Sequence, residues 1–260
     1  MYNELFSIGP LTIHGYGLMI GIGVLVALFW STKRGAKRGI NEDNATTILL
    51  IAVVVGFAGA KVLYVITDWQ YFLRDPLGAL GSEGFVVYGG IITGILGCWL
   101  YCRRKKINFG DGLDVFMPPV AAAQGFGRIG CFLAGCCYGK ATDSVCGVIF
   151  PSGGAPAVPV WPTQLFSSAG DFLLALVLAL YDRREHARGN TGSMYLILYG
   201  VGRFLIEFMR DDPRGNVGFF STSQFISLFM VPIGVALYVL NNKRAAKEKA
   251  QQEEAVSDGE

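Results

Sequence analysis

Charged side chains lie inside long apolar stretches of this sequence. They are Lys61, Arg128, Asp171, Arg203 and Glu207. An ionisable group inside a bilayer is costly unless it is paired or solvated, so each marks a candidate functional site. The set holds more cations than acids, which leaves a cation for an anionic ligand. Because arginine binds phosphate through two parallel hydrogen bonds, we expect a phospholipid headgroup as that ligand.

The spacing of the polar residues places them on common helix faces. Tyr195, Tyr199, Arg203 and Glu207 follow one another at four-residue intervals, which predicts one inward-facing polar stripe. Gln124, Arg128 and Cys131 share a second face. Small residues let a backbone or a substrate approach closely. Several glycines surround this second face: Gly125, Gly127, Gly130 and Gly135.

The same charges also fit two roles that involve no phospholipid headgroup. Arg203 with Glu207, and Arg128 with Asp171, are alternatively structural ion pairs. A channel or transporter also tolerates such charges, but the sequence has no paired inverted repeat.

Four cysteines are grouped near the end of the fourth apolar stretch: Cys131, Cys136, Cys137 and Cys146. We predict no metal site, because the spacing is not a Cys-x-x-Cys pair and no histidine lies nearby. The alternatives are a disulfide from Cys146 to Cys136 or Cys137, packing thiols, and a covalent lipid–cysteine intermediate.

The composition predicts the setting in which these residues lie. Of the 260 residues, 52% are hydrophobic and only 16% are charged. The mean hydropathy is +0.43. A soluble domain of this size would carry more charge, so we predict an all-α integral membrane protein.

The apolar stretches predict seven transmembrane helices, since a span needs roughly 20 apolar residues. We expect a kink or a broken start in the fourth, at Pro118 and Pro119. A small structured extracytoplasmic loop is expected at residues 136–160. The expected spans are residues 13–30, 45–66, 85–102, 113–135, 163–181, 191–210 and 221–240.

The basic residues predict the orientation. Clusters of Lys and Arg follow the first, third, fifth and seventh spans, all on one side. The positive-inside rule makes that side cytoplasmic, with the N-terminus outside and the C-terminus cytoplasmic. We therefore expect a membrane domain at residues 1–242. The charged tail at residues 243–260 is expected to be a solvated helix or disordered.

An ordered series of motifs resembles the prolipoprotein diacylglyceryl transferase family. GRIGCFLAGCCYG at residues 127–139 is similar to the family signature. YGVGRFLIEFMR at residues 199–210 and GAKVLYV at 59–65 also match, with Lys61 where the family usually has Arg. Shorter matches run along the chain in the family's order. They are SIGP at 7–10, HGYGLM at 14–19, GG at 89–90, PTQL at 162–165 and STSQFISL at 221–228.

The resemblance implies a reaction. Such enzymes move the diacylglyceryl group of phosphatidylglycerol to the thiol of a lipobox cysteine in a prolipoprotein, and glycerol phosphate leaves. It implies a multi-pass protein of the bacterial inner membrane that needs no cofactor and binds no nucleic acid. The catalytic residues implied are Arg128, Arg203, Tyr16, Tyr88, Tyr199 and Glu207. The substrate-binding residues implied are Lys61, Gln124, Gly127, Cys131, Lys140, Gln164 and His14.

The chain departs from the family pattern at positions expected to line the site. Tyr88 stands where the family carries a histidine that is often assigned as the base. Cys131 and Cys136 replace an asparagine and a glutamate of the signature, and Lys140 replaces its closing arginine. A cation beside the incoming thiol would favour the thiolate without a histidine. The alternatives are a related phospholipid-dependent transferase with another acceptor, and a non-catalytic lipid-binding or transport protein.

Overall fold

The computed structural model describes residues 4–8, 11–82, 84–151, 157–211 and 216–257. Gly9 and Pro10 of the SIGP motif and the last three residues of the predicted tail lie outside the described residues. The chain forms two compact units. The first contains Met1–Trp30 with Leu113–Glu260, and the second is Ser31–Gly112.

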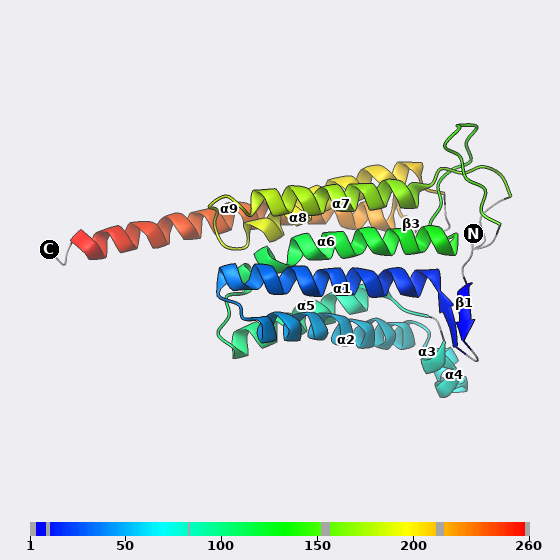
Figure 1. The fold of residues 1–260 in the computed structure, drawn as a ribbon, viewed down its shortest axis with the longest axis horizontal. Helices are drawn as coiled ribbons and strands as arrows, with labels where there is room; N and C mark the ends of the chain where they lie inside the picture. The colour runs from blue at the N-terminus through cyan, green and yellow to red at the C-terminus, as the bar shows by residue number, and fades with distance from the viewer. Residues whose placement is uncertain (1–3, 9–10, 83, 152–156, 212–215, 258–260) are drawn as a thin grey trace. The chain divides into compact units, whose positions relative to one another are not determined.

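The first unit is built from long helices with short hairpins (Figure 1). Strands β1 (Glu4–Ile8) and β2 (Leu11–His14) pair antiparallel before α1 (Gly15–Gly35) begins. The first helix therefore begins two residues later than predicted, because Ile13 and His14 belong to β2. The other elements are α6 (Phe109–Ala134), α7 (Thr163–Tyr181), α8 (Asn190–Ile206), η2 (Glu207–Met209), β3 (Asn216–Val217), β4 (Phe220–Ser221) and α9 (Thr222–Ser257).

Small residues bring the helices of this unit close together. A side chain at Gly125 of α6 would meet the Phe172 ring of α7 at 2.9 Å. The Ser168 hydroxyl of α7 also donates to the Gly125 carbonyl at 2.9 Å. The buried core between α6, α7 and α8 surrounds these contacts. It contains Ala121, Ala122, Leu174, Ala175, Leu178 and Tyr195.

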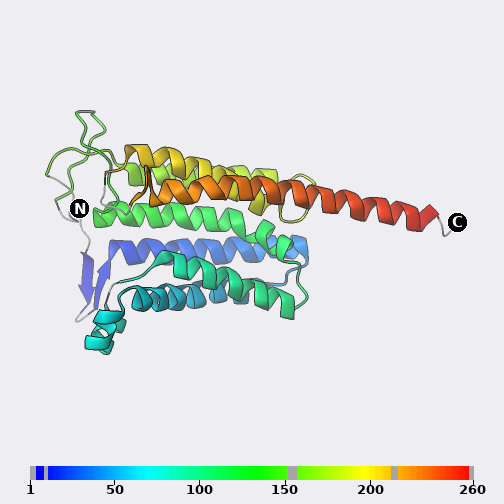
Figure 2. The ribbon, with the colours of Figure 1, turned by 180° about the vertical axis from the view of Figure 1, so that it is seen from behind.

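Two of the predicted spans belong to longer helices. Helix α6 runs without a break through Pro118 and Pro119, so the expected broken start is not formed. The helix begins at Phe109, which places both prolines in its interior. Helix α9 continues through the expected boundary at residue 242 and ends at Ser257. The described part of the tail is thus helical, and Figure 2 shows it extending past α7 and α8.

The second unit is centred on a close helix pair. It contains η1 (Ala36–Arg38), α2 (Glu42–Thr67), α3 (Trp69–Arg74), α4 (Pro76–Gly81) and α5 (Val87–Arg104). Added side chains at Gly59 of α2, or at Gly89 and Gly90 of α5, would collide with the partner helix. Thr93 of α5 donates to the Val55 carbonyl of α2 at 3.0 Å. The glycines therefore allow the backbones to touch, as in many membrane helix pairs.

Among the described residues, four helices are long and apolar enough to cross a membrane: Gly15–Arg38, Glu42–Thr67, Thr163–Tyr181 and Thr222–Ala255. Large apolar side chains on them are solvent-exposed, including Leu25 at 65% and Val54 at 63%. Lipid tails would cover such faces in a bilayer. The prediction of a helical membrane protein is confirmed, with short strands added at two hairpins.

Candidate functional site

The polar stripe on α8 lies inside the first unit, as its spacing predicted. The Tyr195 and Tyr199 rings stack with centroids 5.4 Å apart and planes 6° from parallel. Tyr195 is only 9% exposed. Its hydroxyl donates to Oε1 of Gln124 on α6 at 2.9 Å. This hydrogen bond therefore connects the face of α6 that carries Arg128 with the face of α8 that carries Arg203.

The C-terminal end of this stripe holds an ion pair. Nη2 of Arg203 lies 2.9 Å from Oε2 of Glu207, with side chains only 10% and 6% exposed. The same Nη2 donates to Oγ of Ser223 at 2.7 Å. Nη1 of Arg203 is buried and has no hydrogen-bond partner within the described part of the chain. One edge of the guanidinium is thus held in place while the other is left for a ligand.

Glu207 lies in a different element from the one predicted. Helix α8 ends at Ile206, and Glu207 begins the 3₁₀ turn η2. The expected sixth span at residues 191–210 is therefore too long at its end. The tighter turn also places Nε of Arg210 3.9 Å from Oε2 of Glu207. Glu207 thus faces two guanidinium groups.

Arg128, unlike Arg203, forms no ion pair with the described residues. Among the described residues, no carboxylate oxygen lies within 4.0 Å of its guanidinium nitrogens and no hydrogen bond to it is found. The alternative in which Asp171 pairs with Arg128 is therefore not realised, whereas the Arg203–Glu207 pair is formed. Arg128 is half-buried on α6. That a cation of this set binds an anionic ligand stays a prediction, and Arg128 is the arginine that fits it.

Space is open beside Arg128. A side chain added at Gly127 would have no described atom within 4 Å. Three residues further on, one added at Gly130 would approach the Tyr16 ring of α1 at 3.0 Å. Gly130 therefore lets Tyr16 lie against the last turns of α6. The Tyr16 side chain is 43% exposed and remains accessible to a substrate.

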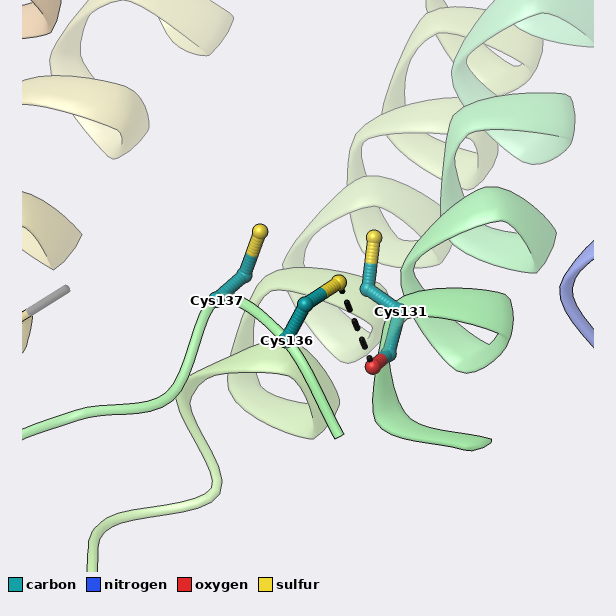
Figure 3. Close-up of side chains that lie close together, drawn as sticks. All are labelled: Cys131, Cys136 and Cys137. Atoms are coloured by element: carbon teal, nitrogen blue, oxygen red, sulfur yellow. Dashed lines mark hydrogen bonds between the residues drawn. The ribbon is translucent and has the colours of Figure 1, made fainter. Parts of the chain in front are cut away.

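Three thiols converge at the end of α6 (Figure 3). The sulfur atoms of Cys131, Cys136 and Cys137 all lie within 4.8 Å of one another. The helix ends in a Schellman-type cap, in which Cys136 N–H donates to the Cys131 carbonyl at 3.1 Å. Gly135 adopts the left-handed conformation with φ of 70°, and so does Cys137 with φ of 64°. This turn carries the two later cysteines back toward the first.

The N-terminus of α7 holds this turn from the other side. Nε2 of Gln164 donates to the Cys136 carbonyl at 2.7 Å, and Oγ1 of Thr163 donates to the Cys137 carbonyl at 2.9 Å. Gln164 is 1% exposed. Its expected role in substrate binding stays a prediction, while its position assigns it to the support of the thiol turn.

Charges around the turn favour one thiolate. The neighbouring thiols of Cys131 and Cys136, with the guanidinium of Arg210, hold the pKa of Cys137 well below its ordinary value. None of the six cysteines forms a disulfide, and Cys146 is exposed. The disulfide considered for Cys146 is therefore not formed in this structure.

The other candidate residues take no part in the contacts around Arg128, Arg203 and the thiol turn that are described above. His14 ends β2 and is exposed, and Lys140 is exposed in the loop after α6. Lys61 and Tyr88 belong to the second unit. Nζ of Lys61 donates to the carbonyls of Ser82 at 2.6 Å and Gly84 at 3.2 Å. Tyr88 lies in the first turn of α5 and is 43% exposed.

Lys61 also borders an apolar groove of the second unit. The groove has a volume of about 440 Å³. Because the Lys61 ammonium is held by backbone carbonyls, it is a fixed positive charge at this groove rather than a mobile one. Its lining residues are Ala58, Lys61, Val62, Val65, Ile66, Trp69, Phe72 and Leu80.

The sequence reasoning did not identify a buried carboxylate and a buried histidine. Asp114 of α6 is fully buried, and its two oxygens accept from the backbone N–H groups of Gly189 and Thr191 at 2.8 and 2.9 Å. It thereby caps the N-terminus of α8. The His186 side chain is also buried, at 4% exposed, and its Nε2 lies 3.1 Å from Oδ1 of Asp182. The early position of Asp114 in an apolar stretch was the available signal.

Comparison with known proteins identifies the family. The model of the family described as prolipoprotein diacylglyceryl transferase matches residues 3–240. A phosphatidylglycerol–prolipoprotein diacylglyceryl transferase 2 of Clostridium perfringens is 47% identical over 254 residues, covering 96% of this chain and 98% of that protein. A phosphatidylglycerol–prolipoprotein diacylglyceryl transferase of Clostridium tetani is 48% identical, covering 95% and 100%. One of Streptococcus pyogenes serotype M3 is 34% identical, covering 91% and 93%.

The match extends over both compact units and includes the motifs around Arg128 and Arg203. With its buried arginines, its polar stripe and its apolar helices, this chain belongs to the prolipoprotein diacylglyceryl transferase family.

Proposed function

We propose that this chain is a membrane transferase that moves the diacylglyceryl group of phosphatidylglycerol to the lipobox cysteine thiol of a prolipoprotein. The names of its relatives support the donor, the acceptor and the group transferred. The observation that carries the proposal is the half-buried Arg128, which forms no ion pair or hydrogen bond with the described residues. A guanidinium group without an ion-pair partner binds a phosphate more strongly than it binds a neutral ligand.

The reaction replaces a carbon–oxygen bond of the lipid with a carbon–sulfur bond to the acceptor. The acceptor sulfur, as a thiolate, attacks the glycerol carbon that carries the phosphate ester. The carbon–sulfur bond forms as the carbon–oxygen bond breaks, and the electron pair goes to the phosphate oxygen. Glycerol phosphate leaves, and the thiol proton goes to solvent. Because negative charge develops on the leaving oxygen, fixed guanidinium groups stabilise the transition state most.

Each site residue has its own role in the proposed reaction. Arg128 and Arg203 bind the phosphate, and Glu207 holds the Arg203 guanidinium at 2.9 Å in one orientation. Tyr199 stacks on Tyr195 along the wall, and Tyr16 faces the end of α6. Gly127 leaves open space for the lipid beside Arg128. Lys61, Lys140, His14 and Tyr88 contribute to substrate binding or positioning.

The same proposal includes seven spans, formed by α1, α2, α5, α6, α7, α8 and α9. Basic residues end α1, including Lys33 and Arg34, and others end α5, including Arg103 and Arg104. The positive-inside rule places these ends in the cytoplasm of a bacterial cell. The thiol turn and Lys140 then face outward, where the signal peptide of a translocated prolipoprotein presents its lipobox cysteine. The domain at residues 1–242 is the catalytic part, and residues 243–260 extend into the cytoplasm.

A reconstituted assay tests the proposal. Purified protein in vesicles containing phosphatidylglycerol should release glycerol phosphate only when a lipobox peptide with cysteine is added. Arg128→Ala and Arg203→Ala should lower this release at least about 100-fold, because each removes a charge that stabilises the leaving group. Arg184→Ala is the matched control, since Arg184 is exposed in the loop after α7.

The outcomes separate the candidate functions. Release with another thiol or hydroxyl acceptor, but none with the lipobox peptide, replaces the acceptor and favours a related transferase. Tyr88 at the family's histidine position is the observation that keeps this second candidate in the test. Binding of phosphatidylglycerol without turnover favours a lipid-binding protein. Full activity of either arginine variant contradicts the phosphate-binding role.

A further inference from the structure

The cluster of three thiols at the end of α6 has the geometry of a metal site. Its sulfur atoms lie within 4.8 Å of one another. With zinc–sulfur bonds of about 2.3 Å, tetrahedral coordination places two sulfurs about 3.8 Å apart. Small side-chain rotations therefore bring these thiols to bonding distance. In Figure 3 the Cys136 sulfur lies between those of Cys131 and Cys137. The spacing in the sequence argued against a metal site, but the turn brings the three thiols together.

The backbone of the turn is held in an unfavourable conformation. Cys137 has φ of 64°, a left-handed conformation that is unfavourable for a residue with a side chain. Two side-chain hydrogen bonds from α7 fix the carbonyls of Cys136 and Cys137. Strain held by buried contacts is typical of sites that bind ligands. Hydrogen bonds from α7 thus hold the turn that keeps these thiols together.

The surrounding charge fits a zinc–thiolate complex. One Zn²⁺ with three thiolates carries a net charge of −1, which requires a nearby cation. Arg210 contacts Cys137, and Arg128 lies within electrostatic range of Cys131. Two guanidinium groups therefore accompany the site. Thiolate ligands select zinc or copper(I) over harder cations, and zinc needs no oxidant or reductant.

We propose that Cys131, Cys136 and Cys137 bind one Zn²⁺ ion whose fourth coordination position receives the acceptor thiol of the prolipoprotein. This inference rests on the proposed function for the identity of the acceptor. Within the described part of the chain, the group contains no fourth protein ligand. Three protein ligands with an open position are typical of catalytic rather than structural zinc.

The ion would supply the thiolate that the transfer needs. A free thiol has a pKa near 8.5, so only about 3% is thiolate at pH 7. A thiol that coordinates zinc is deprotonated, and its proton goes to water. The zinc-bound sulfur then attacks the glycerol carbon, and the electron pair of the breaking carbon–oxygen bond goes to the phosphate. The product is a neutral thioether, which binds zinc weakly and leaves.

This route accounts for two features together. Tyr88 replaces the family's histidine, and cysteines stand at two positions of the family signature. A zinc-bound thiolate needs no histidine base. Tyr16 lies near both Arg128 and the three thiols, so the phosphate and the acceptor sulfur would meet in one place.

Metal binding by the full-length chain tests the ligand set. Reduced, metal-free protein in detergent is titrated with Co²⁺, then with Zn²⁺ against a chelator of known affinity. We expect one ion per chain, with thiolate-to-cobalt charge-transfer bands and the intense visible bands of tetrahedral cobalt. Cys131→Ser, Cys136→Ser and Cys137→Ser should each weaken Zn²⁺ binding at least about 100-fold, as loss of one ligand does. Cys146→Ser is the control and should bind as the native chain does.

The wild-type titration keeps the test decisive even where a variant fails to fold. Absence of thiolate-to-cobalt bands in the wild type overturns the inference. So does native-like Zn²⁺ affinity in folded Cys136→Ser protein, or full turnover by the metal-free chain.

A second measurement tests the acceptor role. A lipobox peptide with cysteine should shift the visible cobalt bands, whereas the same peptide with serine should not. Identical spectra with both peptides overturn the role of the fourth position. Arg128→Ala should keep the metal and lose turnover. If the chain binds zinc but transfers no diacylglyceryl group to any lipobox peptide, the proposed function fails while the ligand set stands.

Discussion

The side-chain amide of Gln164, at the start of α7, donates a hydrogen bond of 2.7 Å to the main-chain carbonyl of Cys136. This contact joins residues 28 positions apart and fixes the thiol turn to a neighbouring helix. Since Gln164 is 1% exposed, water cannot replace its bond. The order of the thiol turn therefore depends on α7.

Gln164→Leu should loosen the thiol turn. The change leaves the Cys136 carbonyl without this donor, which costs about 1–3 kcal/mol of stability. Cys136 and Cys137 should then react faster with a thiol reagent, measured by mass spectrometry of the labelled peptides. Ser168→Ala is the control, because it removes a bond of the same helix to Gly125 instead. Equal thiol reactivity in both variants would show that Gln164 does not order the turn.

Gly127→Ala should separate lipid binding from stability. The open space at Gly127 accepts a methyl group, and alanine favours a helix over glycine by about 1 kcal/mol. We therefore expect unchanged or higher thermal stability with a raised KM for phosphatidylglycerol, because the methyl group occupies the space of the lipid. Gly170→Ala is matched, since Gly170 of α7 is equally open. An unchanged KM in Gly127→Ala contradicts lipid contact at this position.

Arg203→Lys should reduce turnover although it keeps the charge. A single ammonium cannot contact Glu207 and Ser223 and still present a second nitrogen to a phosphate. We expect kcat/KM to fall roughly 10- to 100-fold, about 1.4–2.8 kcal/mol of transition-state stabilisation. Arg184→Lys serves as the exposed control. Native kinetics in Arg203→Lys would mean that charge alone, rather than the fork of the guanidinium, is needed.

Asp114→Ala should destabilise the opposite end of the first unit without changing the chemistry. The substitution removes both acceptors from the first backbone amides of α8. Loss of a helix cap costs about 0.5–2 kcal/mol, and more when the amides stay buried. The midpoint of thermal unfolding in detergent should fall, while KM for phosphatidylglycerol in the folded protein stays the same. A raised KM with native stability would instead assign Asp114 to the substrate site.

The sequence by itself determined the helices and the charged residues that matter. Apolar stretches long enough to cross a bilayer must form helices, because lipid offers backbone groups no partner. The four-residue spacing predicted one polar stripe and left the Arg203–Glu207 pair as an alternative. The Tyr195–Tyr199 stack and that pair both join residues about one helical turn apart. Composition and local periodicity are sufficient for such contacts.

Only the tertiary structure decided which charges and thiols stand together. Arg128 forms no ion pair among the described residues. Gln164 supports the thiol turn because the start of α7 packs against the end of α6. The three thiols converge through left-handed turns at Gly135 and Cys137 that no hydrophobic period encodes. Contacts between helices depend on packing directions that a linear pattern does not carry. The chemistry of this site therefore follows from the fold, although its residues were visible in the sequence.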